Sequence, residues 1–172
     1  MKWSLNTSAW SGTSLIQHKV IDMVVGVDWG VRNAVTVVTS GGLILYRKRG
    51  VGLDPEKVAA EIVRLLPRGS IIAVEDLKGI RGRVHTSKAR YLPYGKLQSH
   101  LKEFAKQAGM GLVKVKAAWT STTCPRCLCR SKFNRIQEVF KCLRCGFVAD
   151  ADIVGAWNVA RRAASSMRGG QR

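Results

Sequence analysis

The chain has 172 residues, with 29 lysines and arginines against 11 aspartates and glutamates, so its formal net charge is +18. This length accommodates one main domain and a small appendage, because single domains most often have about 100–150 residues. No stretch of about 18 apolar residues occurs, which argues against a transmembrane helix. The excess of positive charge predicts a polyanionic partner. Nucleic acid is favoured over a membrane, because no basic amphipathic helix stands out.

The amino-terminal segment, residues 1–20, shows neither a clear period nor the apolar run of a secretory leader, so we interpret it as an extension of a cytoplasmic protein. Three strand-like runs follow, MVVGVDWG, AVTVVTS and LILYRKRG, which begin at residues 23, 34 and 43. They are rich in β-branched residues and separated by short turns. The pattern therefore predicts a three-stranded meander.

Helical and strand patterns alternate further along the chain. Asp54 followed by Pro55 is typical of a helix start, and the apolar spacing after them predicts a helix. SIIAVEDL at 70–77 predicts a buried strand and GLVKVKA at 111–117 an edge strand. A second helix is expected between them, at 95–108.

Two CxxC motifs, TCPRC and KCLRC, lie near the carboxyl end. Each motif presents two thiolates to one centre, and four thiolates suit tetrahedral Zn²⁺ in a closed structural site. A redox dithiol or disulfides are the alternatives. Cys129 is interpreted as an unpaired bystander before it is considered a substitute ligand. The predicted ligands of one Zn²⁺ are Cys124, Cys127, Cys142 and Cys145.

Residues 119–148 are expected to form this zinc ribbon, inserted between the edge strand and a last helix from Asp152 to about Ala164. A four-cysteine site has no open coordination position, so catalytic groups must lie elsewhere. We expect most of the nearby aromatic residues to form the small core of the ribbon, and one of them could stack on an unpaired base. These residues are Trp119, Phe133, Phe140 and Phe147.

Residues 79–93 are rich in Lys, Arg and Gly and show no periodic pattern. We expect them to form a loop beside the end of the strand at 70–77, and we call it the basic loop. A solvated loop is the plain alternative. Because of its position, we interpret its four cations, the lysine just before it and two cations of the ribbon as nucleic-acid contacts. The candidates are Lys78, Arg81, Arg83, Lys88, Arg90, Lys132 and Arg135.

Three carboxylates stand where strands and a helix can bring them together. Asp28 lies within an apolar strand run and Glu75 follows another, and an unpaired carboxylate is costly to bury. If these two strands are neighbours, Asp152 at the start of the last helix can complete the group. Hard oxygen ligands favour Mg²⁺ or Mn²⁺, and two such ions about 4 Å apart would support phosphodiester hydrolysis. Asp150 either shares this metal site or caps the helix.

The motifs GVDWG, AVEDL and, beyond the CxxC pair, DADIVGAWNVAR resemble the three-part RuvC nuclease signature of the RNase H-like superfamily. More narrowly, WTSTTCPRC and KCLRCGFVADAD are similar to the C-terminal region of transposon-encoded TnpB (OrfB) proteins and type V CRISPR effectors. The resemblance runs from about residue 24 to 162. Matching the motifs position by position implies that Asp28, Glu75 and Asp152 are the catalytic acids.

The resemblance implies an α/β fold, an RNase H-like mixed five-stranded sheet flanked by helices with an inserted zinc ribbon. Residues 21–118 and 149–165 would form the core, and 166–172 a flexible tail. The implied activity is that of a DNA endonuclease with Mg²⁺ or Mn²⁺, two ions being expected. TnpB-like proteins have a large part before the first motif that grips guide RNA. Only about twenty residues precede it here, so cleavage guided by RNA is not expected of this chain alone.

Two other functions stay open. The chain could be a nucleic-acid-binding module or subunit without autonomous cleavage. It could also be an enzyme like the Holliday-junction resolvases, which needs a dimer to make paired cuts. DNA, branched or single-stranded, is the expected partner, with a guide RNA or a partner protein as an addition. The sequence does not determine the oligomeric state.

Overall fold

The computed structural model describes residues 23–30, 34–50, 52–76 and 94–169, and the structural statements below concern these residues. Five strands form one mixed sheet in the order β3-β2-β1-β4-β5. β1, β2 and β3 pair antiparallel, whereas β4 joins β1, and β5 joins β4, in parallel. The predicted fold class is thereby confirmed, and the condition that the first and fourth strands are neighbours is met. The strands are β1 (Val24–Gly30), β2 (Ala34–Thr39), β3 (Ile44–Arg49), β4 (Ile71–Asp76) and β5 (Gly111–Lys116).

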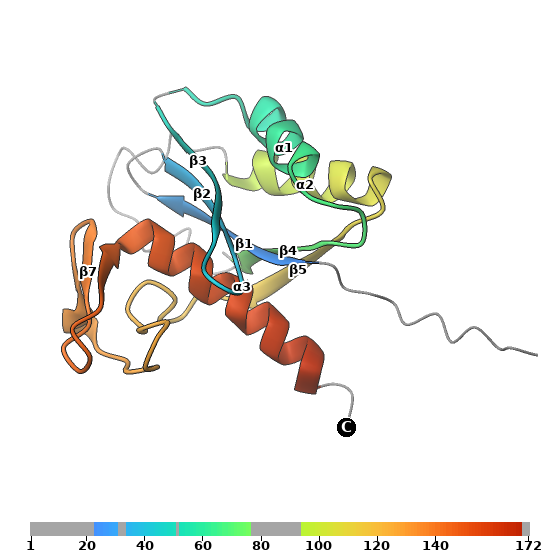
Figure 1. Ribbon diagram of the computed structural model, residues 1–172. Coiled ribbons are helices and arrows are strands. Elements are labelled where there is room, and N and C mark those ends of the chain that lie inside the picture. The colour runs from blue at the N-terminus through green and yellow to red at the C-terminus, as the bar shows by residue number, and fades with distance from the viewer. Residues whose placement is uncertain (1–22, 31–33, 51, 77–93, 170–172) are drawn as a thin grey trace, which may run out of the picture.

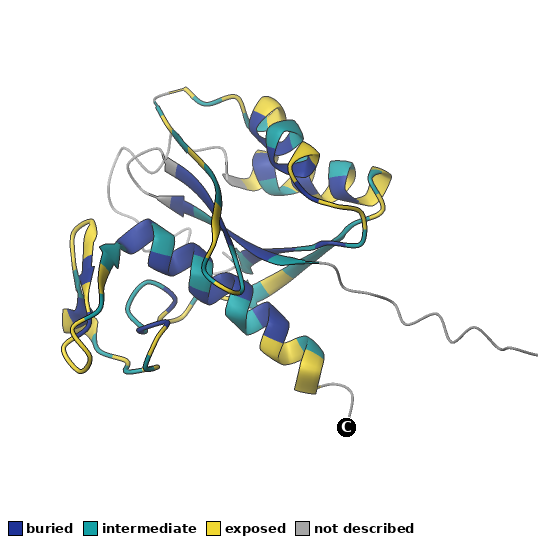
Figure 2. Ribbon diagram, viewed as in Figure 1, coloured by how far each residue is buried: buried dark blue, intermediate teal, exposed yellow. Residues whose placement is uncertain are grey.

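Helices cover both faces of the sheet. Helices α1 (Pro55–Arg64) and α2 (Tyr94–Gln107) lie together on one face, and α3 (Ala151–Gly169) crosses the other (Figure 1). The sides that the helices turn toward the sheet are buried (Figure 2). As predicted, α1 begins at an Asp54 cap, whose carboxylate accepts a 3.0 Å hydrogen bond from the backbone N–H of Glu56.

Alternation along the central strands explains how they support two helical layers. Val25 and Val27 of β1 are fully buried in the large core under α1 and α2, while Ala73 of β4 packs with Val159 and Ala163 of α3 on the other face. Strands covered on both faces are apolar throughout, as β1 and β4 largely are. A carboxylate in either strand is therefore costly to bury unless a partner or a bound cation compensates for it.

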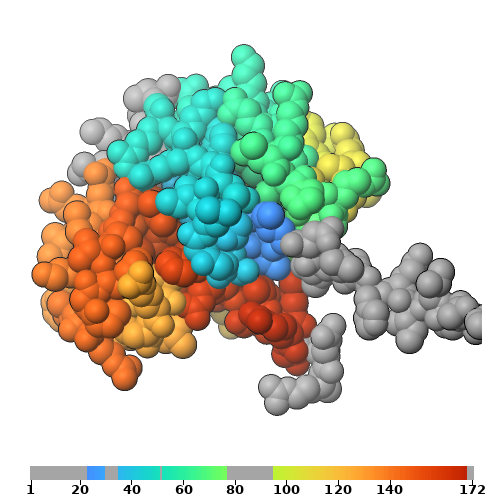
Figure 3. Space-filling view, in the orientation of Figure 1, coloured from blue at the N-terminus to red at the C-terminus, as the bar shows by residue number. Residues whose placement is uncertain are grey.

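The ribbon is a small three-stranded sheet beside the start of α3. Its strands are β6 (Arg135–Ile136), β7 (Val139–Lys141) and β8 (Val148–Asp150), after the short 3-10 turn η2 (Lys132–Asn134). In the space-filling view it forms a lobe beside α3 and the β2–β3 side of the sheet (Figure 3). Its interior is continuous with the first turn of α3, because Phe140 and Cys142 cluster with Ala151 and Val154.

The interior of the ribbon differs from expectation. Phe140 is fully buried against Cys124, Cys142 and the first turn of α3, and Phe147 packs beside them. Phe133 and Trp119, however, are 65% and 42% exposed. The prediction that most of the four aromatic residues form the core was wrong, because one phenylalanine, the cysteines and the first turn of α3 already fill so small an interior.

The last helix is longer than predicted. α3 continues to Gly169, so the start of the tail expected at 166–172 is helical. Ala163 and Ala164 are buried, and the helix extends one more turn past them. No helix in the described part of the chain has the length and apolar character needed to cross a membrane.

α3 and β1 touch through their backbones. A Cβ atom added at Gly26 would lie 2.1 Å from the carbonyl oxygen of Ala156 and 2.5 Å from the backbone nitrogen of Ala160. Both distances are far below any real contact. Glycine at this position therefore permits the close approach that sets the height of α3 above the sheet.

We expect Gly26→Ala to lower the free energy of unfolding by about 1–3 kcal/mol or more, because helix and sheet must separate to accept the methyl group. Guanidinium denaturation followed by circular dichroism measures the change. Gly41→Ala is the control, since its Cβ would meet nothing nearer than the Thr39 hydroxyl at 3.8 Å. Equal stability of the two variants would contradict the proposed contact.

Candidate active site and zinc site

The four predicted zinc ligands converge. Their sulfur atoms all lie within 4.8 Å of one another, with 3.6 Å between Cys124 and Cys145 and 3.5 Å between Cys127 and Cys142. A tetrahedron of sulfurs about 2.3 Å from zinc has edges of about 3.8 Å, so the donor set fits Zn²⁺. All five cysteines are free thiols, which contradicts the disulfide alternative, and Cys129 lies outside the group.

Backbone amides support this site. Burial raises the pKa of the Cys142 thiol, but hydrogen bonds from the backbone N–H groups of Cys145 and Arg144 and contacts with neighbouring thiols bring it down to about 6. The Cys145 N–H lies 3.5 Å from the Cys142 sulfur. A thiol that ionises near neutral pH is already in the form that binds metal.

The three predicted catalytic acids come from three elements that meet at one end of the sheet, on its central strands. Val27 pairs with Val74, so Asp28 of β1 and Glu75 of β4 follow them on adjacent strands. Asp152 lies in the first turn of α3. One turn later, a Cβ at Gly155 would lie only 2.7 Å from a carboxylate oxygen of Asp28. The missing side chain of Gly155 thus makes room for Asp28 against the helix.

The acids repel one another. Burial raises the pKa of Asp28 well above its ordinary value, and the negative charges of Glu75 and Asp152 raise it further. Burial also raises the pKa of Glu75 and of Asp152, with the charge of Asp150 adding to the effect on Asp152. Three carboxylates that are costly to ionise together form a site that a bound cation would stabilise.

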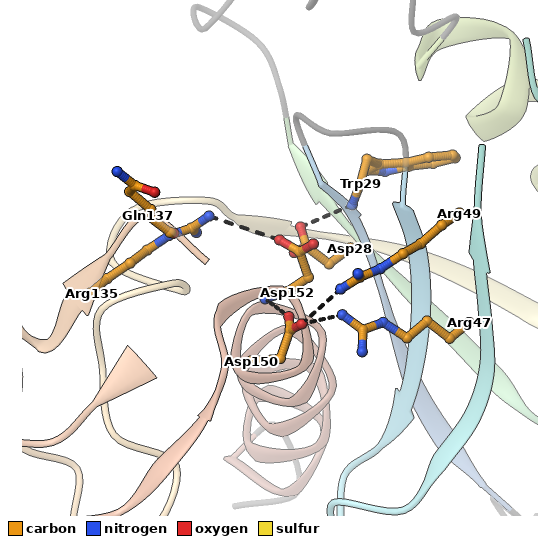
Figure 4. A network of polar contacts seen from close by, with 8 residues as sticks. All are labelled: Asp28, Trp29, Arg47, Arg49, Arg135, Gln137, Asp150 and Asp152. Carbon is orange, nitrogen blue, oxygen red and sulfur yellow. Dashed lines mark hydrogen bonds and ion pairs between the residues drawn. The ribbon is translucent and has the colours of Figure 1, made fainter. Parts of the chain in front are cut away.

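Arg135 of the ribbon reaches this group. Its Nη2 lies 3.8 Å from Asp152, and its positive charge opposes the rise in pKa at all three acids. The guanidinium is oriented by its Nε, which donates to the carbonyl oxygen of Gln137 at 2.9 Å (Figure 4). We predicted Arg135 as a nucleic-acid contact, but its place among the acids was not predicted.

Glu75 is held by the segment that leads into the ribbon. The hydroxyl of Thr120, which is 3% exposed, is hydrogen-bonded to the Glu75 carboxylate. Asn158 of α3 donates 2.7 Å bonds to the carbonyl oxygens of Thr120 and Thr123 and so fixes this segment to the helix. Nothing in the sequence pattern pointed to Thr120, because the contact joins residues 45 positions apart.

Asp150 has partners that suit the capping alternative. It accepts a 2.9 Å bond from the backbone N–H of Asp152 and ion pairs from Arg47 and, at 3.0 Å, Arg49. Burial raises the pKa of Asp150, but these hydrogen bonds outweigh that effect and leave it below its usual value. A metal-binding role for Asp150 remains a prediction. Arg47 and Arg49 could have been found from the alternation in YRKR, which places both on one face of β3.

The remaining predicted cations are less informative. Lys132 is exposed, with its ammonium 5.0 Å from the ring centre of Phe133. The predicted contacts of the basic loop lie outside the described residues and stay predictions; they are Lys78, Arg81, Arg83, Lys88 and Arg90.

Comparison with known proteins confirms the resemblance inferred from the motifs. Residues 94–159 match the Cas12f1-like TNB domain. A TnpB-like protein of Aquifex aeolicus is 32% identical over 120 residues, which cover 64% of this chain and 39% of that protein. The CRISPR-associated endodeoxyribonuclease Cas12f1 of Sulfoacidibacillus thermotolerans is 36% identical over 90 residues, 52% of this chain and 21% of that protein. The chain therefore spans well under half of these curated relatives.

Solved structures share the fold. Cas12f1 in a complex with sgRNA and target DNA superposes with a TM-score of 0.68 at 17% identity, over 83% of this chain and 50% of that one. Thermus thermophilus RuvC in complex with a Holliday junction superposes with a TM-score of 0.52 at 14% identity, over 87% of this chain and 96% of that one. These likenesses show that this chain shares the fold of the two structures.

Asp28→Asn should stabilise the protein in the absence of Mg²⁺ and Mn²⁺ at neutral pH, by on the order of 1 kcal/mol. The folded-state pKa of Asp28 lies above its unfolded value, so the folded state holds this proton more tightly. The free energy of unfolding therefore falls as pH rises from about 4, the unfolded pKa, through the raised pKa. Asparagine does not ionise, so the variant does not lose this stability as the pH rises.

Urea denaturation at several pH values measures this difference, which should close below about pH 4, where Asp28 is protonated in both states. A variant less stable than the parent at pH 7 would show that Asp28 has a compensating partner.

Cys142→Ser should abolish zinc binding and release the ribbon from the core, because a structural zinc site contributes folding free energy directly. Metal analysis should give one zinc per parent chain and none in the variant, and limited proteolysis should cut within residues 119–150. Cys129→Ser is the matched control and should keep its zinc. Loss of zinc in the control would assign Cys129 to the ligand set.

Proposed function

We propose that this chain is a metal-dependent endonuclease that hydrolyses phosphodiester bonds of DNA. The observation that carries the proposal is the meeting of Asp28, Glu75 and Asp152, whose pKa values are all raised, at one end of the sheet. A fold alone does not specify chemistry. A group of buried, mutually repelling carboxylates narrows the choice, because such groups gain most from binding cations.

The acids would hold Mg²⁺ or Mn²⁺. Two such ions about 4 Å apart would supply an activated water and would stabilise the leaving oxygen of the phosphodiester.

The protein's own residues would orient the substrate and the acids. Arg135 is attracted to all three carboxylates; once their charge is neutralised, its planar guanidinium is free to bind a phosphate oxygen of the substrate. Thr120 holds Glu75 in one rotamer through its hydroxyl. Arg47 and Arg49 keep Asp150 at the helix start and thereby fix the first turn that carries Asp152.

The relatives support DNA as the substrate, since Cas12f1 is named an endodeoxyribonuclease and its solved complex contains target DNA. That complex also contains sgRNA, so a guide RNA is a second proposed partner. Junction resolution is the alternative activity, because the match to RuvC spans 96% of that chain. Resolution would require a dimer for paired cuts.

Purified zinc-loaded chain should cut DNA only when Mg²⁺ or Mn²⁺ is added. The panel is single-stranded, duplex and four-way-junction DNA and single-stranded RNA, each with and without a candidate guide. Asp28→Asn should reduce the cleavage rate by about 10³-fold or more, since several kcal/mol of metal-derived stabilisation disappear. Arg135→Ala should reduce it by about 10²–10³-fold. Arg144→Ala is the control, because this exposed ribbon cation has no contact with the acids.

The substrate that is cut separates the alternatives. Preference for four-way junctions would favour resolution. Salt-sensitive binding without cleavage under any of these conditions would contradict the proposal and favour a nucleic-acid-binding module.

A further inference from the structure

Trp119 is exposed where a tryptophan would ordinarily be buried. It is 42% exposed, and its backbone φ of 68° lies in the left-handed region, which is costly for a bulky residue. The carbonyl oxygen of Trp119 accepts bonds from the backbone N–H of Thr123 at 3.1 Å and from its hydroxyl at 2.8 Å. The turn is thus held in a strained form that keeps a large aromatic ring at the surface.

A cation accompanies the ring. The guanidinium carbon of Arg130 lies 3.7 Å from the ring centre of Trp119, and Arg130 is itself exposed. Planar aromatic and guanidinium groups are the surfaces on which unpaired bases stack. We call Trp119 with Arg130 the stacking platform.

The platform adjoins the acids. The next residue, Thr120, is hydrogen-bonded to the Glu75 carboxylate. Arg162 donates a 2.6 Å bond to the carbonyl oxygen of Ala118, on the other side of Trp119. Burial lowers the pKa of Arg162, the charge of Glu75 raises it and the charge of Arg130 lowers it, so Arg162 interacts electrostatically with both residues.

The positive charge of the ribbon indicates which kind of ligand binds the stacking platform. Residues 119–148 contain six lysines and arginines and a single acid, Glu138. An exposed aromatic ring in such surroundings is complementary to a base attached to phosphates rather than to an acidic or apolar protein surface. In a duplex the faces of the bases are already stacked, so only an unpaired base can use the ring.

We infer that Trp119 and Arg130 bind an unpaired nucleobase of the strand that enters the acid site, and thereby select single-stranded over duplex nucleic acid. The inference rests on the proposed function for the identity of that strand. It adds a residue that sets substrate structure and does not itself take part in the chemistry.

The test measures binding on an Asp28→Asn background, where nothing is cut. The probes are fluorescein-labelled thymidine and uridine oligonucleotides and a DNA duplex, followed by fluorescence anisotropy with the zinc-loaded chain. Trp119→Ala should weaken binding of the single strands by about 5- to 150-fold and leave duplex binding within about twofold. Trp119→Phe should restore most of the loss, because it keeps an aromatic face.

Phe133→Ala is the matched control, since Phe133 is an exposed ribbon aromatic 65% accessible to solvent with its own cation, Lys132. It should leave single-strand binding unchanged, and thermal melting should show that each variant remains folded. Equal loss on single strands and duplex, or no loss with Trp119→Ala, overturns the inference. Trp119-dependent binding in a parent chain that never cuts would instead support the inference and count against the proposed function.

Discussion

The direct backbone contact between α3 and β1 determines where the candidate catalytic groups lie. Gly26 has no side chain to separate the two elements, so the first turns of α3 pass immediately over the end of β1. That height brings Gly155 against Asp28 and leaves Asp152 beside it. The parallel pairing of β1 with β4 then supplies Glu75. The α3–β1 contact and the β1–β4 pairing together therefore set the relative positions of the three acids.

The ribbon is more than an appendage, because it supplies neighbours to these acids. Arg135 counters their repulsion from one side, and the segment at Thr120 holds Glu75 from another. Arg135 lies between the two CxxC pairs, and Thr120 lies just before the first of them. Because zinc bound at a structural site contributes folding free energy, the predicted zinc would help to hold both residues beside the predicted catalytic acids.

The sequence predicts those features that depend on local period or spacing. Strand alternation, the Asp54 cap and the two CxxC pairs each depend on residues close in the chain, and the structure agrees with them. Arg135 and Thr120 reach the acids only through the placement of the ribbon, which no local pattern encodes. Gly155 was a readable signal, because glycine inside a helix often marks a close neighbour. The prediction that Phe133 is buried was wrong, because an aromatic side chain is buried only where there is interior volume for it to fill.

Because α3 follows the strands of the sheet in the chain, the α3–β1 contact can form only after those strands have been synthesised. Asp152 follows Asp28 by 124 residues, so at about 5–20 residues per second the third acid arrives some 6–25 s after the first. A nascent or prematurely terminated chain can complete most of the sheet and yet lack the helix that completes the group of acids. The group of three carboxylates is thus complete only once α3 has been made, and a ribosome-bound intermediate that ends before α3 carries only part of it.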